Sequence, residues 1–427
     1  MASLTAAQLP EALVTKFIKE VADDLYGQTW FLNYFQKGTE EFAGNQVQFR
    51  TKVRRNPSGG FRSGTRLARP GKFAMKWATV GLKRATFSTS IDRVFMKQVR
   101  QSKPEAVVDA LQMDIADLKI AGQRKLELAF MGTGDAVIAQ LNGAHGAGAT
   151  TFTVEDPEGR THGAARFIEE GAYLVLQPDV PGGEVHVVAD TVSWVNQTFT
   201  IDSTATGGAV PALPDQAKIV YGDPDGNSYN NEPDGGVAAL FSSAANYLGL
   251  SRNTYNAWAP TSVGAVGDDT PFNVPYIQQI LDIPKDVSGA GDAAGPDLLV
   301  GHSSIWRSYL AEEVLPKKLN VQVDGIYKEG IQRAAWINGD RILPIEQAAT
   351  APYGDIIGLK SEGWRIYSLG SSGLEVIPNV SGGNLHEIPG YDEYFIYMAF
   401  EGNIACRLPK QQVRIRGIRI NASNLPR

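Results

Sequence analysis

The sequence predicts a mixed α+β fold with an extended basic β-segment, a long helix and a larger α/β body. Three patterns predict it. Apolar and polar residues alternate within 46–90, apolar residues recur at helical spacing within 104–131, and helical and strand patterns alternate within 223–375. A chain of 427 residues is long enough for two or three domains. The 43% hydrophobic and 20% charged residues are those of a folded protein.

Charge is distributed very unevenly along this chain. The net charge is −6, but residues 48–103 contain 15 Lys or Arg and one acid, Asp92, which gives 15 − 1 = +14. The remaining residues therefore carry −6 − 14 = −20. Such asymmetry indicates an acidic protein partner or a nucleic acid, whereas a solvated basic face is the plain alternative. Copies of the chain can also neutralise these opposite charges by placing the basic segment of one copy on the acidic body of the next.

The composition restricts the compartment and the classes of site. Cys406 is the single cysteine, so neither an intrachain disulfide nor a multi-cysteine zinc site is expected. There is no run of about 18 apolar residues, so no membrane-spanning helix is expected. Met1 to Pro10 has neither a basic start nor a sustained apolar core, which argues against a signal peptide. We expect a protein made in a cytosol.

The first half of the chain predicts an arm, a strand pair and a helix. Residues 1–45 form an arm with some helix. Within 46–90, strand patterns flank glycine- and proline-rich turns, giving a basic two-stranded segment with too little apolar surface for a core of its own. Pro104 suits the first position of a helix, and Gly132 its end. One face of that helix carries Val107, Leu111, Ile115, Leu118 and Gly122.

The second half predicts a small β-domain inside a larger unit. Short strand patterns separated by Pro and Gly turns fill 143–222, which favours an inserted sandwich or barrel. Helices and strands then alternate through 223–375, and two long strands close the chain within 376–427. Cys406 lies in the second of these closing patterns, where a buried, inert thiol is expected.

No catalytic or cofactor motif is complete in this sequence. Gly301-His302-Ser303 begins like a nucleophile elbow, but Ile305 stands where the last glycine is needed. The acids between Asp223 and Asp234 partly match a calcium loop, yet Ser228 replaces its required glycine. We therefore predict no enzyme, no metal and no cofactor.

Three stretches in a particular order are similar to those of a known family. Residues 85–91 lead into the long helix, 296–300 precede a serine-capped helix, and 392–405 form closing strands. With the arm and the basic segment, this order resembles the major capsid protein of tailed bacteriophages, whose fold is shared with encapsulins and the herpesvirus capsid floor. The implied parts are an N-terminal arm (1–45), an extended basic β-loop (46–90), a peripheral domain (91–142) with a spine helix (104–131), an inserted β-domain (143–222), an axial domain (223–375) and closing peripheral strands (376–427).

The resemblance implies a shell protein. Hexamers and pentamers of one chain would build an icosahedral phage head around double-stranded DNA, held non-specifically, with the extended loop and arm lying on neighbouring subunits. A portal and separate scaffolding or decoration proteins would be further partners, with no membrane. The protein would be located in the virion after assembly in the bacterial cytoplasm. The candidate intersubunit residues are Arg54, Arg55, Arg62, Arg66, Arg69, Lys72 and Lys76.

Three other functions stay open at this point. An encapsulin-like cargo shell would share the fold without the virion. A nucleic-acid-binding protein could use 48–103, where Phe61, Phe73 and Trp77 lie among the cations, although the −20 on the remaining residues would repel the same DNA. An enzyme with an unrecognised site is the third alternative.

Overall fold

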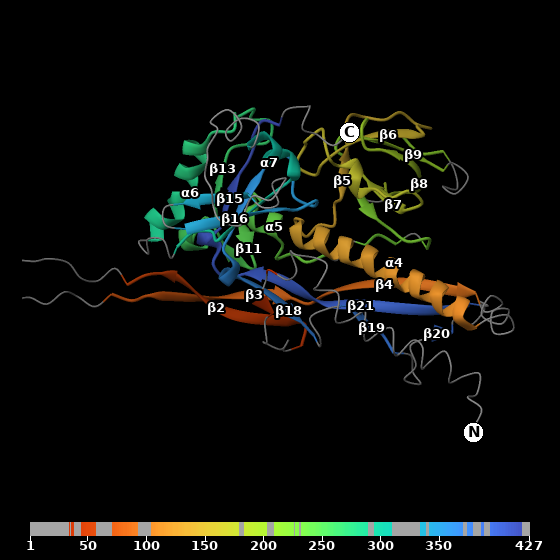
Figure 1. Ribbon diagram of the computed structural model, residues 1–427, viewed down its shortest axis with the longest axis horizontal. Helices are drawn as coiled ribbons and strands as arrows, with labels where there is room; N and C mark the ends of the chain where they lie inside the picture. The colour runs from red at the N-terminus through yellow and green to blue at the C-terminus, as the bar shows by residue number, and fades with distance from the viewer. Residues whose placement is uncertain are drawn as a thin grey trace, which may run out of the picture. The chain divides into compact units, whose positions relative to one another are not determined.

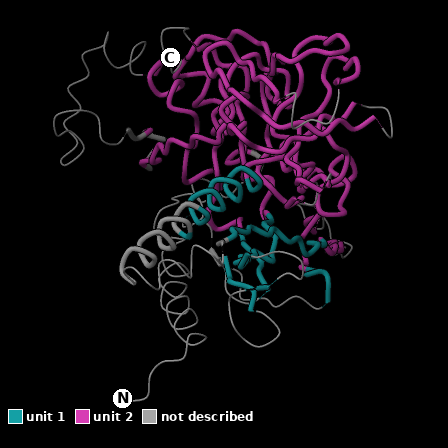
Figure 2. The backbone as a smooth tube through the Cα atoms, turned by 90° about the vertical axis from the view of Figure 1, so that its right-hand side faces the viewer, with its two compact units in different colours: residues 1–48, 79–130, 365–405 teal, residues 49–78, 131–364, 406–427 magenta. Residues whose placement is uncertain are grey.

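The computed structural model contains helices and sheets in two compact units, and each unit is described by itself. Unit 1 comprises residues 1–48, 79–130 and 365–405, and unit 2 comprises 49–78, 131–364 and 406–427 (Figure 2). The structure describes residues 34, 36–37, 44–56, 71–92, 104–178, 183–202, 209–225, 227–229, 232–288, 294–309, 334–338, 341–369, 374–378, 386–387 and 393–420.

Unit 1 is built on a sheet around one long strand, β21 (Glu393–Cys406). β21 pairs antiparallel with β4 (Lys83–Asp92) over ten residue pairs, from Glu393 opposite Asp92 to Gly402 opposite Lys83. The other strands of this six-stranded sheet are β1 (Gln36–Lys37), β18 (Trp364–Ser368), β19 (Glu375–Val376) and β20 (His386–Glu387). Ile396 and Met398 of β21 are fully buried, so this strand supplies part of the core.

The long helix α4 (Pro104–Met131) belongs to unit 1 and confirms the helix predicted from the sequence (Figure 1). Phe130, near its end, packs edge-to-face against Phe400 with ring centroids 5.6 Å apart. A Cβ on Gly122 would lie 3.0 Å from Leu374 and 3.5 Å from Phe87. Gly122 therefore allows the helix to approach Phe87 of β4 and Leu374, which precedes β19, closely.

Unit 2 contains a closed barrel of six strands in the order β10-β5-β6-β9-β8-β7 (Figure 1). Its core includes the stacked rings of Phe152 and Phe199, both almost fully buried. The barrel begins four residues before the predicted region 143–222. Its strands are β5 (Ala139–Leu141), β6 (Thr151–Glu155), β7 (Tyr173–Gln177), β8 (Val185–Ser193), β9 (Thr198–Ile201) and β10 (Lys218–Tyr221).

Unit 2 also contains a mixed six-stranded sheet, in the order β13-β22-β17-β14-β16-β15. Helices α6 (Val274–Ser288) and α7 (Ser303–Tyr309) contribute Ile277, Leu281 and Ile305 to its core. The strands are β13 (Thr261–Val263), β14 (Leu298–Gly301), β15 (Ala334–Asn338), β16 (Arg341–Gln347), β17 (Ile356–Leu359) and β22 (Val413–Ile415).

Several elements are short. Helix α5 (Val237–Phe241) is followed by the paired strands β11 (Asn246–Tyr247) and β12 (Leu250–Ser251). The 3₁₀ turns are η1 (Ala165–Phe167), η2 (Asn256–Trp258), η5 (Ser361–Gly363) and η6 (Pro409–Gln411). A separate two-stranded sheet joins β2 (Gln46–Arg54) and β3 (Ala74–Gly81).

The structure differs from the sequence prediction at two strand assignments. The basic β-segment was predicted to extend to residue 90, but β4 pairs with β21, so the two-stranded part ends at Gly81. The closing residues were predicted as two long strands of one domain, but β22 pairs with β13 and β17 in the sheet of unit 2. Apolar alternation predicts strands and contains no information about which distant strand is the partner.

Candidate intersubunit surface

The paired strands β2 and β3 form a ribbon with one buried and one exposed face. On β2 the buried side chains include Val47, Phe49 and Val53, and they alternate with exposed residues. Phe49 anchors this face, because its ring lies 6.3 Å from that of Trp258 and the Arg407 guanidinium lies 5.2 Å from its centroid. The ribbon therefore has the period-two pattern of a strand pair that is covered on one side.

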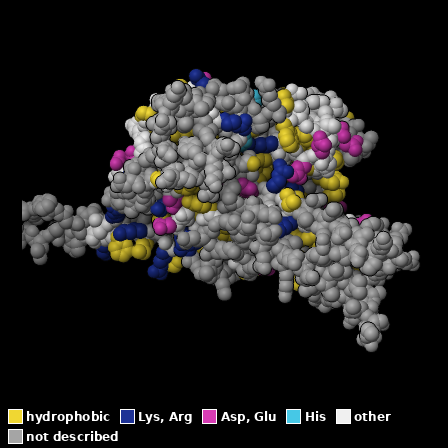
Figure 3. Space-filling model, viewed as in Figure 1, with side chains coloured by type: hydrophobic (Ala, Val, Ile, Leu, Met, Phe, Trp, Pro, Cys, Tyr) yellow, Lys and Arg dark blue, Asp and Glu magenta, His cyan; other side chains and the backbone are white. Residues whose placement is uncertain are grey.

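Cations and large apolar side chains share the exposed face of the ribbon. Phe73, Met75 and Trp77 are each about half exposed, at alternate positions along the chain. The Arg50 guanidinium lies 4.5 Å from the centre of the Trp77 ring, and the Lys52 ammonium lies 5.8 Å from that of Phe73. Basic and apolar side chains lie side by side along this ribbon in the space-filling view (Figure 3). We call the set Arg50, Lys52, Phe73, Met75 and Trp77 the outer face of the ribbon.

Four of the seven predicted intersubunit residues lie within the ribbon strands or within two residues of their ends. Arg54 and Arg55 end β2 or follow it, Lys72 precedes β3, and Lys76 lies within it; all four are exposed. Arg62, Arg66 and Arg69 lie outside the described residues. The sequence identified the charge of this surface but attached no intersubunit role to its exposed apolar side chains.

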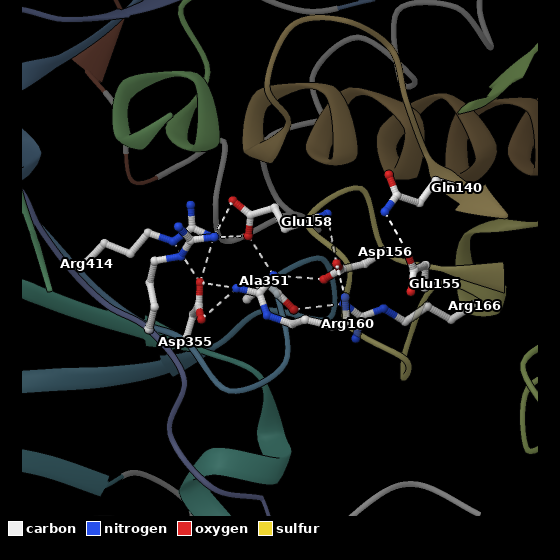
Figure 4. Close-up of polar contacts among 10 residues, drawn as sticks. Gln140, Glu155, Asp156, Glu158, Arg160, Arg166, Ala351, Asp355 and Arg414 are labelled. Carbon is white, nitrogen blue, oxygen red and sulfur yellow. Dashed lines mark hydrogen bonds and ion pairs between the residues drawn. The ribbon is translucent and has the colours of Figure 1, made fainter. Parts of the chain in front are cut away.

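A buried ion network joins the barrel to the six-stranded sheet within unit 2, and no sequence motif predicts it. The barrel side contributes the loop that follows β6, and the sheet side contributes β22, the residue after it and the residue before β17. Three carboxylates and three guanidinium groups make the network, so its formal charge is zero (Figure 4). The members are Asp156, Glu158, Arg160, Asp355, Arg414 and Arg416.

Asp355 is the centre of this network and is completely buried. Both of its oxygens accept hydrogen bonds from Arg160 Nη2, each at 2.8 Å, and Oδ2 also accepts one from Arg414 Nε at 2.7 Å. Glu158 Oε2 accepts from Arg160 at 2.6 Å and from Arg414 at 2.5 Å. Burial raises the pKa of Glu158, but the Arg414 and Arg160 guanidinium groups outweigh it and hold that pKa at about 2.

A second contact between barrel and sheet surrounds the ring of Tyr353. The Arg166 guanidinium lies 4.5 Å from the Tyr353 ring centre and donates from Nη2 to the Ala351 carbonyl at 2.8 Å. The His302 ring centre is 4.1 Å from that of Tyr353, and Nδ1 of His302 lies 2.9 Å from Ser304 Oγ. Burial and the Arg166 charge lower the pKa of His302 to about 3, so this histidine is neutral at pH 7.

Replacing Gly163 by alanine should disrupt this second contact. A Cβ at Gly163 would lie 1.7 Å from the Tyr353 ring, and its φ of +90° disfavours any side chain. We expect the free energy of unfolding to fall by about 2–3 kcal/mol. Urea unfolding followed by tryptophan fluorescence measures it. Gly146→Ala is the control, because nothing lies within 4 Å of a Cβ there; equal losses of stability in the two variants would contradict the prediction.

The residues considered for chemistry do not converge on a site. Within the described residues no group of three or more His, Cys, Asp or Glu side chains is placed to hold a metal ion. Asp223 instead accepts hydrogen bonds from the backbone and side chain of Asn227. Cys406 is fully buried, and burial raises the pKa of its thiol far above its usual range. None of the described helices is long and apolar enough to cross a membrane.

No family model matches the chain, and no curated protein matches it. Among solved structures, the chain is similar to the cyanophage A-1(L) capsid asymmetric unit, with 13% identity, a TM-score of 0.49 and coverage of 91% of this chain and 93% of that one. It is also similar to the capsid of Myoviridae phage XM1 (8% identity, TM-score 0.43, 91% and 92% covered). A virus-like particle from Pyrococcus furiosus is similar at 10% identity and a TM-score of 0.38, with 94% and 98% covered. The chain is thus similar to phage capsid structures and to a virus-like particle along about nine-tenths of its length.

Proposed function

We propose that this chain is a major capsid protein that assembles into hexamers and pentamers of an icosahedral phage head enclosing double-stranded DNA. The observation that carries the proposal is the outer face of the ribbon, where half-exposed Phe73, Met75 and Trp77 lie among cations. Exposed apolar patches of this kind mark interaction sites. The family resemblance implies that the extended loop lies on a neighbouring subunit, so the partner of this face would be that subunit.

Charge supports association between copies. The segment 48–103 carries +14 and the remaining residues carry −20, so a basic ribbon on one copy attracts the acidic surface of another. The exposed Arg54, Arg55, Lys72 and Lys76 would lie at the edges of that contact. Because these charges face solvent, salt should weaken the attraction. Association through many such contacts builds a large assembly from individually weak interactions.

The further parts of the proposal follow from the family resemblance. The arm, extended loop, peripheral domain, inserted β-domain and axial domain would have the bounds given above, except that the two-stranded part of the loop ends at Gly81 and β22 belongs to the sheet of unit 2. Packaged DNA would be held by phosphate contacts without sequence preference. A portal and separate scaffolding or decoration proteins would complete the head, and the protein would be located in the virion after assembly in the bacterial cytoplasm.

Negative-stain electron microscopy of the purified recombinant protein, with light scattering for mass, tests the proposal. Closed shells, tubes or rings of five or six subunits are expected. A monodisperse 46.1 kDa monomer that persists at high concentration and low salt would overturn it. Binding of DNA by that monomer, with a steep loss of affinity on adding salt, would instead establish the nucleic-acid alternative. Shells that enclose a protein cargo would establish the encapsulin-like alternative.

A further inference from the structure

The barrel is the most acidic part of the chain by density of charge. Residues 143–222 contain ten Asp or Glu and three Lys or Arg, which gives 3 − 10 = −7 over 80 residues. Residues 223–427 contain 16 basic and 23 acidic residues, which gives the same −7 over 205 residues. Of these two regions, residues 143–222 therefore have the higher density of negative charge.

The contacts with the six-stranded sheet take up barrel charges of both signs, Asp156 and Glu158 as well as Arg160 and Arg166, so the exposed charges must be counted separately. Two of the three basic residues, Arg160 and Arg166, point into the contacts with the six-stranded sheet and are largely buried there. Lys218 is the exposed base among the described barrel residues. The exposed acids described in the barrel are Glu170, Glu184, Asp190 and Asp215.

Acids flank an exposed aromatic ring at one end of β7 and β8. Tyr173 is 43% exposed and lies opposite Val188, and Asp190 follows two residues later on the same face of β8. Glu170 Oε1 accepts a hydrogen bond from the backbone N–H of Val192, which places this carboxylate on the same strand end. Acidic side chains are visible over the barrel strands in the space-filling view (Figure 3). This acidic patch, Glu170, Tyr173 and Asp190, has the chemistry that complements aromatic rings stacked with cations.

We propose that the acidic patch of one barrel is the surface on which the outer face of a second copy's ribbon docks. The inference rests on the proposed self-assembly, and the acidic patch is the surface that would accept the ribbon. Arg50 and Lys52 would face Glu170 and Asp190, while the apolar side chains of β3 would cover Tyr173. Two contacts with the sheet fix the barrel in unit 2, so the acidic patch is held in one orientation within that unit. Docking on it therefore loses little conformational entropy on the barrel side.

Charge reversal with rescue tests this pairing. The barrel variant is Glu170→Lys with Asp190→Lys, and the ribbon variant is Arg50→Glu with Lys52→Glu. Each alone should raise the protein concentration needed for assembly by about tenfold or more, because like charges then meet. The two together should return that concentration to within about threefold of the unaltered protein. The control, Asp286→Lys with Glu362→Lys, makes the same charge change at exposed residues of unit 2 outside the barrel and should have little effect.

The outcomes separate this inference from the proposed function. If the unaltered protein forms no assembly at any concentration, the proposed function fails. If it assembles but the barrel variant needs the same concentration for assembly as the control, only the docking inference is overturned. The same holds if the combined variant needs as high a concentration as either single variant. Circular dichroism of each variant verifies that the fold is retained, and a misfolded barrel variant is replaced by Glu170→Gln with Asp190→Asn.

Directed disulfide formation tests proximity between copies. Cys406 is completely buried, so introduced cysteines provide the reactive thiols. One population carries Met75→Cys and another carries Tyr173→Cys, each with a different affinity tag. Mild oxidation with diamide, which is reduced as the two thiols lose two protons and two electrons, should give a mixed dimer that thiol reduction separates. Glu362→Cys replaces Tyr173→Cys in the control. A mixed dimer no more abundant than in the control would overturn the docking.

Discussion

Replacing Arg414 by alanine should lower the free energy of unfolding of unit 2 by about 3–5 kcal/mol, since one member of a buried ion pair is removed and its partners remain. Arg414 is 1% exposed and Asp355 is fully buried. Asp355 would keep only its two bonds from Arg160, and Glu158 would lose a 2.5 Å contact. The carboxylates would then carry more negative charge than the remaining guanidinium groups neutralise, in a region from which water is excluded.

Urea unfolding followed by tryptophan fluorescence measures this loss, because Trp258, Trp306 and Trp336 are buried in unit 2. Arg419→Ala is the matched control. Arg419 pairs with Asp269 at 2.8 Å, but both side chains are exposed, at 46% and 68%. Such a surface pair is worth about 0–1 kcal/mol. The conservative variant Arg414→Lys keeps the charge but not the forked geometry of the guanidinium group. Its loss of unfolding free energy should therefore lie between those of Arg414→Ala and Arg419→Ala. A stability of Arg414→Ala equal to that of Arg419→Ala would refute a structural role for the network.

The sequence predicted individual elements better than their partners. The 104–131 helix, the short strands of the barrel and the buried cysteine could be predicted because periodicity and turn residues are local signals. The pairing of β22 with β13 and β17 joins residues about 60 to 150 positions apart, and no local pattern encodes it. For the same reason β4 was assigned to the two-stranded segment, although its partner β21 lies about 300 residues further along the chain.

The ion network shows what residue patterns leave out. Asp156, Glu158 and Arg160 alternate in a loop with ordinary surface composition, and the sheet-side partners of Arg160 and Glu158 are about 200 to 260 residues away. One signal was present: Arg414 stands between Val413 and Ile415, in a stretch whose apolar character predicts burial. A cation at such a position needs carboxylate partners. The partners themselves could not be chosen, because the chain contains 46 acidic residues.

Trp77→Ser should abolish assembly under conditions in which the unaltered protein assembles completely, while leaving the unfolding midpoint of unit 2 unchanged. Trp77 is 51% exposed, and the Arg50 guanidinium lies over its ring, 4.5 Å from the ring centre. This side chain therefore contributes little to the core of its own chain. Tryptophan and arginine anchors at interfaces typically contribute about 2–4 kcal/mol each, and about 1.4 kcal/mol is a factor of ten in affinity. The concentration needed for assembly should therefore rise by about 30-fold or more.

Light scattering across a concentration series measures this threshold, and electron microscopy identifies the products. Trp77→Phe is the matched control, because phenylalanine retains an aromatic face for Arg50 and most of the apolar area; its threshold should stay within about threefold of the unaltered one. If Trp77→Ser assembles as readily as Trp77→Phe, the outer face of the ribbon is not the subunit contact. The comparison is decisive because both variants remove the same indole N–H, and they differ only in whether an aromatic surface remains on the ribbon. An exposed tryptophan that supports only its own chain would respond to both substitutions alike, whereas one that a neighbour covers would respond to the loss of the ring.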